Sequence, residues 1–247
     1  MAKKKEYHRT FLLPNDANRT KLDKIRQILP EYQHTCKNIQ YELYQRWQNG
    51  TNFYNRTDIK SVESILSERY KRSALNQVVA GLDSWEATLQ DAFRKLVSYS
   101  KLDANIKYDL YRINLAKGWY KKSLLVAEPI LYLDGTTTIM WMPIPLDTLF
   151  LARRILKQVL KSLPMPDLYS SNTMHLDNLV ALFEPSKTTS YDYWARISTL
   201  DKGKPVWIPF HSYRYAEEAE GVWSSLAQIT IEDDGNISYK QVKKAPK

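Results

Sequence analysis

The sequence predicts an α+β protein in which a helical segment lies between a first strand and a mostly β-stranded C-terminal half. Two observations lead to this fold class. From residue 15 to 122, apolar residues recur at three- and four-residue steps, the period of amphipathic helices. From residue 123 onwards, short apolar runs are separated by turns that contain Asp and Gly, as in antiparallel hairpins. We therefore divide the chain into 1–14, 15–122 and 123–247.

A short strand is predicted at residues 7–13, where Tyr, Phe and Leu precede Pro14-Asn15-Asp16. Proline and asparagine favour turns, so the strand is expected to stop there. We expect this strand to rejoin the β domain formed by the C-terminal half.

Helices are predicted throughout 15–122. Apolar residues keep a helical period up to Pro30, and again up to Asn49-Gly50, which suits a helix end. Asp58 is suited to cap a short helix. The expected helical ranges are 22–29, 39–47, 58–66, 73–99 and 103–122. Their apolar stripes are interpreted as packed core.

Strands dominate from residue 123 onwards. A hairpin is expected from 130–133 and 137–141 around Asp134-Gly135, and further strands at 191–198, 205–210, 226–231 and 237–241. A helix at about 147–163, ending before Pro164, interrupts them.

The charge of the chain favours a polyanionic partner. The 247 residues include 36 Lys and Arg against 27 Asp and Glu, a formal net charge of +9. Nucleic acid and anionic membrane surfaces attract such proteins, although a basic protein without a polyanionic partner is the simpler alternative. No apolar run has the ~20 residues of a membrane span, and no signal-peptide core follows Met1. We expect an intracellular protein without a membrane partner.

No complete catalytic constellation is visible. The four histidines are scattered, Cys36 is the only cysteine, and seven glycines leave little room for a phosphate-binding loop. The carboxylates at 217–220 and 232–234 are interpreted as a solvated face and a turn. We therefore expect no catalytic residue, no metal and no cofactor.

The predicted helix 147–163 carries the clearest basic face. Arg153, Lys157 and Lys161 are four residues apart and therefore share one side, with Arg154 beside them. Like charges at this spacing repel one another, and a phosphate backbone would relieve the repulsion. A solvated basic face is the alternative.

A second basic segment is also aromatic and comprises Lys117, Trp119, Tyr120, Lys121 and Lys122. Aromatic rings next to cations suit base stacking beside phosphate contacts. Trp119 is an equally good core residue.

Two smaller groups of cations complete the candidates. One lies at the N-terminus, where a frayed basic end is the alternative, and the other on a hairpin tip. They are Lys3, Lys4, Lys5, His8 and Arg9, and Lys202 and Lys204.

Two segments resemble the N-terminal half of TnpB-type transposon nucleases and type V CRISPR effectors. Residues 70–79 (YKRSALNQVV), followed by Trp85 and Ala92-Phe93, resemble a recognition-lobe helix of that family. Residues 193–210 (YWARISTLDKGKPVWIPF) resemble a strand, Gly-Lys turn and strand of its wedge domain. The order of the predicted elements is also similar over most of the chain.

The resemblance implies a helical recognition lobe, 15–122, inserted into a wedge (oligonucleotide-binding-like) β-barrel. It further implies that the protein binds a guide RNA and takes part in recognising target double-stranded DNA next to a short flanking motif. The matching positions add Lys71, Arg72, Asn76, Gln77 and Arg196 to the candidate nucleic-acid-binding residues. Asn and Gln can pair bidentately with adenine, although an ordinary polar helix face is the alternative.

The sequence departs from the family after residue 240, where a RuvC-like nuclease domain would begin. Three explanations stay open: the nuclease half is a separate RuvC-containing chain, it was lost, or this chain is truncated. We expect no nuclease activity in this chain, and a cytoplasmic location in a prokaryotic cell or phage-infected host.

Two other functions stay open beside this one. The first is a guide-independent DNA- or RNA-binding protein of a mobile element or phage. The second is a scaffold subunit whose basic faces meet an acidic protein. A phosphoryl-transfer enzyme is a more distant third.

Overall fold

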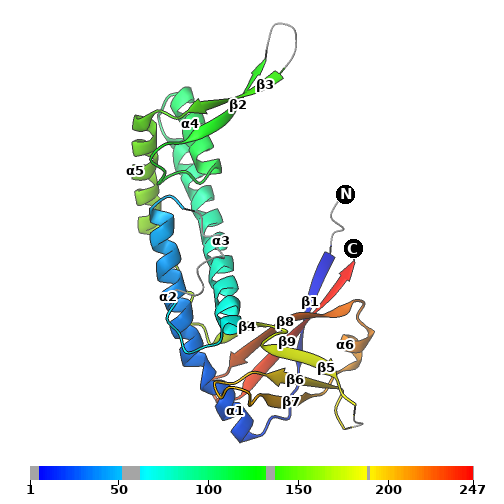
Figure 1. Ribbon diagram of the computed structural model, residues 1–247. Coiled ribbons are helices and arrows are strands. Elements are labelled where there is room, and N and C mark those ends of the chain that lie inside the picture. The colour runs from blue at the N-terminus through cyan, green and yellow to red at the C-terminus, as the bar shows by residue number, and fades with distance from the viewer. Residues whose placement is uncertain (1–5, 52–61, 132–136, 188–189, 247) are drawn as a thin grey trace. The chain divides into compact units, whose positions relative to one another are not determined.

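Six helices and nine strands make up the described part of the chain, and the predicted α+β class is confirmed (Figure 1). The structure is a computed structural model that describes residues 6–51, 62–131, 137–187 and 190–246. The helices are α1 (Arg19–Arg26), α2 (Ile28–Gln48), α3 (Glu68–Tyr99), α4 (Ala104–Leu115), α5 (Leu146–Ser162) and α6 (Arg214–Glu218). The strands are β1 (Glu6–Leu13), β2 (Leu125–Leu131), β3 (Thr137–Pro143), β4 (Thr173–Asp177), β5 (Ala181–Pro185), β6 (Tyr193–Ile197), β7 (Val206–Phe210), β8 (Val222–Ile231) and β9 (Ile237–Pro246).

The chain divides into two compact units. The first, here the sheet unit, comprises Met1–Ile39, Arg56–Val78 and Leu168–Lys247, and the second, the helical unit, comprises Gln40–Asn55 and Val79–Asp167. The expected boundary at 122–123 differs from this division, because residues 123–167 belong with the helices. The reason is local: α5 packs against α4, and the Arg153 guanidinium donates hydrogen bonds to carbonyls of the loop that follows α4.

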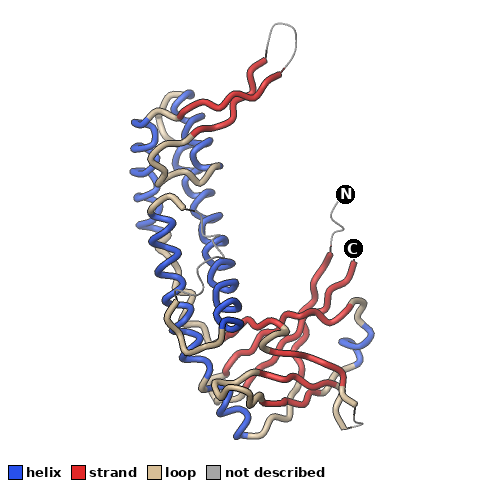
Figure 2. Tube along the Cα trace, in the orientation of Figure 1, coloured by secondary structure: helices blue, strands red, loops and turns tan. Residues whose placement is uncertain are grey.

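Two antiparallel sheets build the sheet unit (Figure 2). One has the strand order β1-β9-β8-β4 and the other β5-β6-β7. β1 pairs with β9 in the register Glu6↔Pro246 to Leu13↔Tyr239, so the expected return of the first strand to the C-terminal strands is confirmed.

Aromatic side chains fill the space between these two sheets. The ring of Phe210 lies 4.4 Å from that of Tyr239, and the ring of Phe183 lies 5.9 Å from Tyr239 and 5.5 Å from Trp223. Phe210 and Tyr239 are fully buried, and burial raises the pKa of the Tyr239 hydroxyl far above its usual value. Large buried rings contribute much of the apolar area that stabilises a sheet sandwich.

The expected closure of the strands into a barrel is wrong, because none of the described sheets closes on itself. At one corner, the strand pairing between the chain after β1 and β7 is limited to an isolated bridge between Asn15 and Phe210. Pro14 lies between β1 and this bridge and has no N–H to donate to a strand ladder. The wider pairing that closure needs is therefore interrupted at this position.

The helical unit has a core of tryptophans. The ring of Trp47 lies 5.3 Å from Trp85 and 6.1 Å from Trp119, and Phe93 packs against Trp119 from α3. The hairpin of β2 and β3 extends beyond the helices of this unit (Figure 1). Every residue of β3 is exposed, including Trp141 at 65%, so the helices do not cover this strand.

Three predicted helices have different ends. Pro30 lies in the first turn of α2 instead of ending a helix, because proline at that position displaces no intrahelical hydrogen bond. The helix predicted at 103–122 ends at Leu115, and Lys117 then adopts a φ of 51° that no continuing helix permits. In the helix predicted at 58–66, residues up to 61 lie outside the described ranges, and residues 62–66 are not helical.

The other predicted elements are confirmed within a few residues, while two strands and a short helix were missed. α5 agrees with the prediction of 147–163 to one residue at each end. β2 begins five residues before the predicted 130–133 and β3 ends two residues after the predicted 137–141, while the predicted Asp134-Gly135 turn lies outside the described residues. The hairpin β8–β9 is longer than predicted. β4 and β5 were missed because each has only five residues. β5 does not alternate clearly between apolar and polar side chains, whereas β4 does, so an available signal for β4 was overlooked.

Candidate nucleic-acid interface

α5 carries an exposed basic side opposite its buried stripe. Thr148, Leu149, Ala152, Leu156 and Val159 form the buried stripe. Arg154, Lys157 and Lys161 are exposed and lie at i, i+3 and i+7, which places them on one side of the helix. Phe150, also exposed at 54%, lies one turn before Arg154 on this side. The side therefore offers three cations and an aromatic ring.

Arg153 is not part of this exposed side, which corrects the predicted grouping with Lys157 and Lys161. Its Nε donates to the Trp119 carbonyl at 3.0 Å, and its Nη2 donates to the Lys121 carbonyl at 2.8 Å. The residue adjoins the buried stripe, and its half-buried guanidinium reaches the loop carbonyls and also lies 5.5 Å from the centroid of the Phe150 ring. Arg153 holds the loop after α4 against α5.

The loop that Arg153 holds contains the predicted aromatic basic segment, and only part of it is accessible. Trp119 is fully buried, so the interpretation of this residue as core is correct. Lys117 forms an ion pair with Glu86, and the ring of Tyr120 packs edge-on against Trp47 at 5.0 Å. Burial also raises the pKa of the Tyr120 hydroxyl. The expected stacking surface is therefore absent from Trp119 and reduced at Tyr120.

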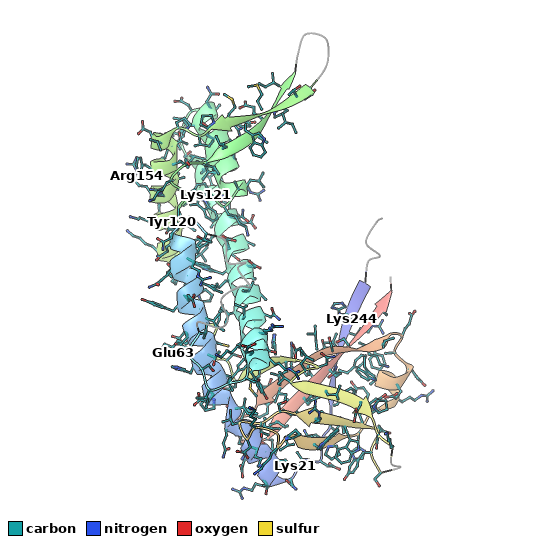
Figure 3. All side chains as sticks on the ribbon, in the orientation of Figure 1. Lys21, Glu63, Tyr120, Lys121, Arg154 and Lys244 are labelled. Carbon is teal, nitrogen blue, oxygen red and sulfur yellow. The ribbon has the colours of Figure 1, made fainter. Side chains whose placement is uncertain are left out.

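Arg153 of α5 holds the Lys121 carbonyl, so Lys121 lies beside this helix (Lys121 and Arg154 are labelled in Figure 3), and the exposed Lys122 follows it in the chain. We name the set Arg154, Lys157, Lys161, Lys121 and Lys122 the α5 cationic face. Among the described residues, no carboxylate forms an ion pair with any of these five side chains. Uncompensated cations in a cluster attract counterions, which a bound phosphate backbone would displace.

In the sheet unit, Gln77 is engaged in internal hydrogen bonds. Its Oε1 accepts from the Tyr32 hydroxyl at 2.9 Å and from the His175 backbone N–H at 3.0 Å, while its Nε2 donates to the Thr173 carbonyl at 3.1 Å. The amide thus fastens α3 to the edge of β4. The Gln77 amide is therefore occupied by internal hydrogen bonds, which compete with the predicted hydrogen bonding to adenine. The neighbouring Asn76 is exposed.

A pocket of about 240 Å³ lies beside this contact. α3 contributes Ser73, Asn76 and Gln77, and the strands β4, β8 and β9 contribute the rest. The strand residues that line it are His175, Leu176, Asp177, Leu226, Ala227, Gln228 and Val242. Polar groups from three elements therefore converge on a mostly apolar pocket, as in many small-ligand sites.

A second aromatic and basic surface lies on the outer side of the β5-β6-β7 sheet. Arg196 stands beside Trp207 in the register of β6 and β7, and Lys21 of α1 lies 5.7 Å from the ring of Trp194. Lys202 and Lys204 are exposed on the turn between the two strands. The predicted residues Arg196, Lys202 and Lys204 are thus close together at one end of this sheet.

The remaining predicted residues are dispersed. The Lys71 Nζ donates to the Val62 carbonyl at 2.9 Å, and Arg72 is exposed on α3. His8 and Arg9 lie on β1, and both are exposed. Lys3, Lys4 and Lys5 lie outside the described residues.

The sequence analysis missed three cations, one beside Trp194 and two on either side of the pocket residue Val242. Lys21 follows the N-cap Asn18 on α1, and Lys240 and Lys244 lie on β9. The alternation of a strand places Lys240, Val242 and Lys244 on the same side of β9 (Lys244 is labelled in Figure 3). This alternation was a signal in the sequence for Lys240 and Lys244, once the strand is extended beyond residue 241.

The described ranges contain neither a metal-binding cluster nor a membrane-spanning helix. No group of three or more His, Cys, Asp or Glu residues there is arranged to hold a metal ion. No helix there is both long and apolar enough to cross a membrane.

Comparisons with protein-family models, with curated proteins and with solved structures found no match to this chain.

Proposed function

We propose that this protein binds nucleic acid, and that the α5 cationic face contacts the phosphate backbone. The observation that carries the proposal is this cluster of five cations without a carboxylate partner among the described residues. The outer side of the β5-β6-β7 sheet supports it, because Lys21, Trp194, Arg196 and Trp207 combine cations with rings on which bases can stack.

At a more specific level, we propose that the nucleic acid is a guide RNA and that the complex recognises target double-stranded DNA without cleavage by this chain. The support is the resemblance of residues 70–79 and 193–210 to the RNA-guided nucleases, together with the return of β1 to β9 around a helical insertion. The closed wedge barrel of that family is the feature that the structure lacks.

The binding proposal is tested by fluorescence anisotropy with a labelled RNA and a labelled DNA duplex over a range of salt. We expect the affinity to fall linearly on logarithmic scales as salt rises, with a slope of about −0.9 per phosphate contacted on a duplex. Lys157→Gln with Lys161→Gln is expected to weaken binding and to flatten this slope. Lys95→Gln with Lys101→Gln is the matched control, because both are exposed lysines of the same unit and the net charge is equal. Equal effects of the two pairs would refute a specific α5 cationic face.

The guide proposal needs a separate experiment. The chain is purified from a host that carries its native locus, and RNA that resists a wash at moderate salt is sequenced. One dominant structured RNA with a variable or locus-matched end is the expected result. Random fragments, combined with salt-dependent binding of duplex DNA in the first assay, would favour the guide-independent binder. If neither bound RNA nor salt-dependent binding is found, the scaffold subunit is the function that remains.

A further inference from the structure

The pocket between α3 and the strands β4, β8 and β9 contains a buried polar group without a partner. Ser73 is 4% exposed, and its Oγ makes no hydrogen bond within the described residues. A buried hydroxyl without a partner costs free energy, so such groups are rare in folded proteins. Ser73 lines the pocket, where a bound molecule can supply the missing partner.

The other polar groups of the pocket are donors and acceptors suited to a neutral heteroaromatic ligand. The amides of Asn76 and Gln228 each offer a donor and an acceptor, and the Asp177 carboxylate accepts. Asp177 Oδ1 already accepts a hydrogen bond from the Leu179 N–H at 3.0 Å, so its Oδ2 is the oxygen that can accept one from a ligand. His175 is exposed on one side, yet partial desolvation lowers the pKa of its imidazole, which favours the neutral form. The pocket therefore offers several hydrogen bonds and no cation of its own.

The walls between these groups are apolar. Leu226 and Val242 line the pocket, and apolar surface makes up most of the lining. The side chain of Leu176 lies on the opposite, buried face of β4, because side chains alternate along a strand. A flat ring can be sandwiched against such walls while its edge meets the polar groups. The volume of about 240 Å³ exceeds that of one nucleobase but is too small for a stack of several.

Cations flank the pocket on one side. Lys240 lies directly opposite Gln228 in the pairing of β8 and β9, and Lys240 and Lys244 lie on either side of Val242 along the same face of β9. Neither lysine has a carboxylate partner among the described residues. A ligand with an aromatic base and an adjoining phosphate would match both parts of this arrangement.

We propose that this pocket binds one unstacked nucleotide of a nucleic-acid strand, with the base between α3 and the sheet and the phosphate at Lys240 and Lys244. The proposal deepens the nucleic-acid-binding function proposed above and rests on it. It differs from reading a base edge in a duplex groove, because the pocket encloses a base that has left its stack. Gln77 positions α3 on β4 and so shapes the pocket.

The test uses ligands that the cationic faces cannot hold. The four uncharged ribonucleosides are titrated into the full chain and followed by backbone amide shifts in NMR spectra. We expect at least one to bind with a dissociation constant on the order of 1 mM, and to shift the amides around Ser73, His175 and Gln228. The matching nucleoside monophosphate is expected to bind more tightly, and Lys240→Gln with Lys244→Gln should remove that gain.

Ser73→Ala separates a binding site from a packing defect. Because the hydroxyl has no partner in the protein, we expect this variant to be as stable as the wild type and to bind the nucleoside about fivefold more weakly. Asn76→Ala should also weaken binding, whereas Asn105→Ala, which replaces an exposed asparagine of α4, should not. Leu226→Trp should block the pocket. Unchanged binding in Ser73→Ala, Asn76→Ala and Leu226→Trp would overturn the proposal.

Competition with an oligonucleotide identifies the source of the nucleotide. A short single strand should displace the bound monophosphate at concentrations well below those of a free nucleotide. If the oligonucleotide does not displace the monophosphate, the pocket is a site for free nucleotides. That result would overturn the proposal that it binds a nucleotide of a strand. If no nucleoside binds while salt-dependent oligonucleotide binding persists, the pocket proposal fails alone. Loss of oligonucleotide binding as well would mean that the proposed function has failed.

Discussion

Glu86 of α3, buried in the helical unit, forms an ion pair with Lys117, which follows α4 and is 36% exposed. The Glu86 side chain is 4% exposed and also accepts a hydrogen bond from the Trp47 indole N–H at 2.8 Å. Lys117 reaches the carboxylate from a backbone with a φ of 51°, in the left-handed region that side chains other than glycine rarely adopt. The strained position is therefore occupied by the residue that neutralises a buried charge.

Replacing Lys117 should destabilise the protein, because the buried Glu86 carboxylate loses its cationic partner. We expect Lys117→Met to lower the free energy of unfolding by roughly 3 kcal/mol, because removing one partner leaves a charge in an apolar core. Chemical denaturation measures the change. In the Glu86→Gln background the same substitution should cost much less. Additive effects in this double-mutant cycle would show that the two residues do not interact.

Replacing Arg153 by glutamine should mainly lower stability, whereas replacing Lys157 by glutamine should mainly lower nucleic-acid affinity. Arg153→Gln removes hydrogen bonds to the carbonyls of Trp119 and Lys121, and we expect a loss of about 2 kcal/mol in the free energy of unfolding. Lys157→Gln removes an exposed cation, so stability should change by less than about 0.5 kcal/mol while nucleic-acid affinity falls. Thermal unfolding and anisotropy on both variants check this. A stable Arg153→Gln protein that binds weakly would reverse the assignment.

Gln77 and Asn76 provide a second contrasting pair. Gln77→Ala breaks the contacts of α3 with Tyr32, Thr173 and His175, and should destabilise the protein by about 2 kcal/mol. Asn76→Ala, at an exposed position of the same helix, should change stability by less than about 0.5 kcal/mol. Urea denaturation of the two variants measures the difference, and equal stabilities would contradict the structural role of Gln77.

The pH dependence of stability should contain a contribution from His175. Desolvation lowers its pKa in the folded protein below the usual 6.5, so between these two values the unfolded chain binds the proton more readily. Stability is therefore expected to fall as the pH is lowered from 6.5 through the folded-state pKa. An NMR titration of the imidazole should give a midpoint below 6.5, and His175→Gln should flatten the stability profile in this range. A midpoint at or above 6.5 would contradict the desolvation.

Properties encoded by neighbouring residues were predictable from the sequence. α5 was located almost to the residue, because its apolar period and Pro164 act over a few positions. The hairpin β8–β9 was recognisable from the Asp-Gly turn between two apolar runs. The excess of cations, which motivates the proposed partner, is a property of composition alone.

The tertiary structure decided which of these residues remain available for a ligand. Arg153 and Arg154 are adjacent and chemically identical, yet only Arg153 lies beside the loop whose carbonyls accept its hydrogen bonds. Gln77 likewise acquires its partners from Tyr32 and β4, which are distant in the chain. Short-range propensity therefore determined where helices and hairpins form. Packing between distant segments determined which polar groups became internal, because hydrogen bonds and burial depend on neighbours in space.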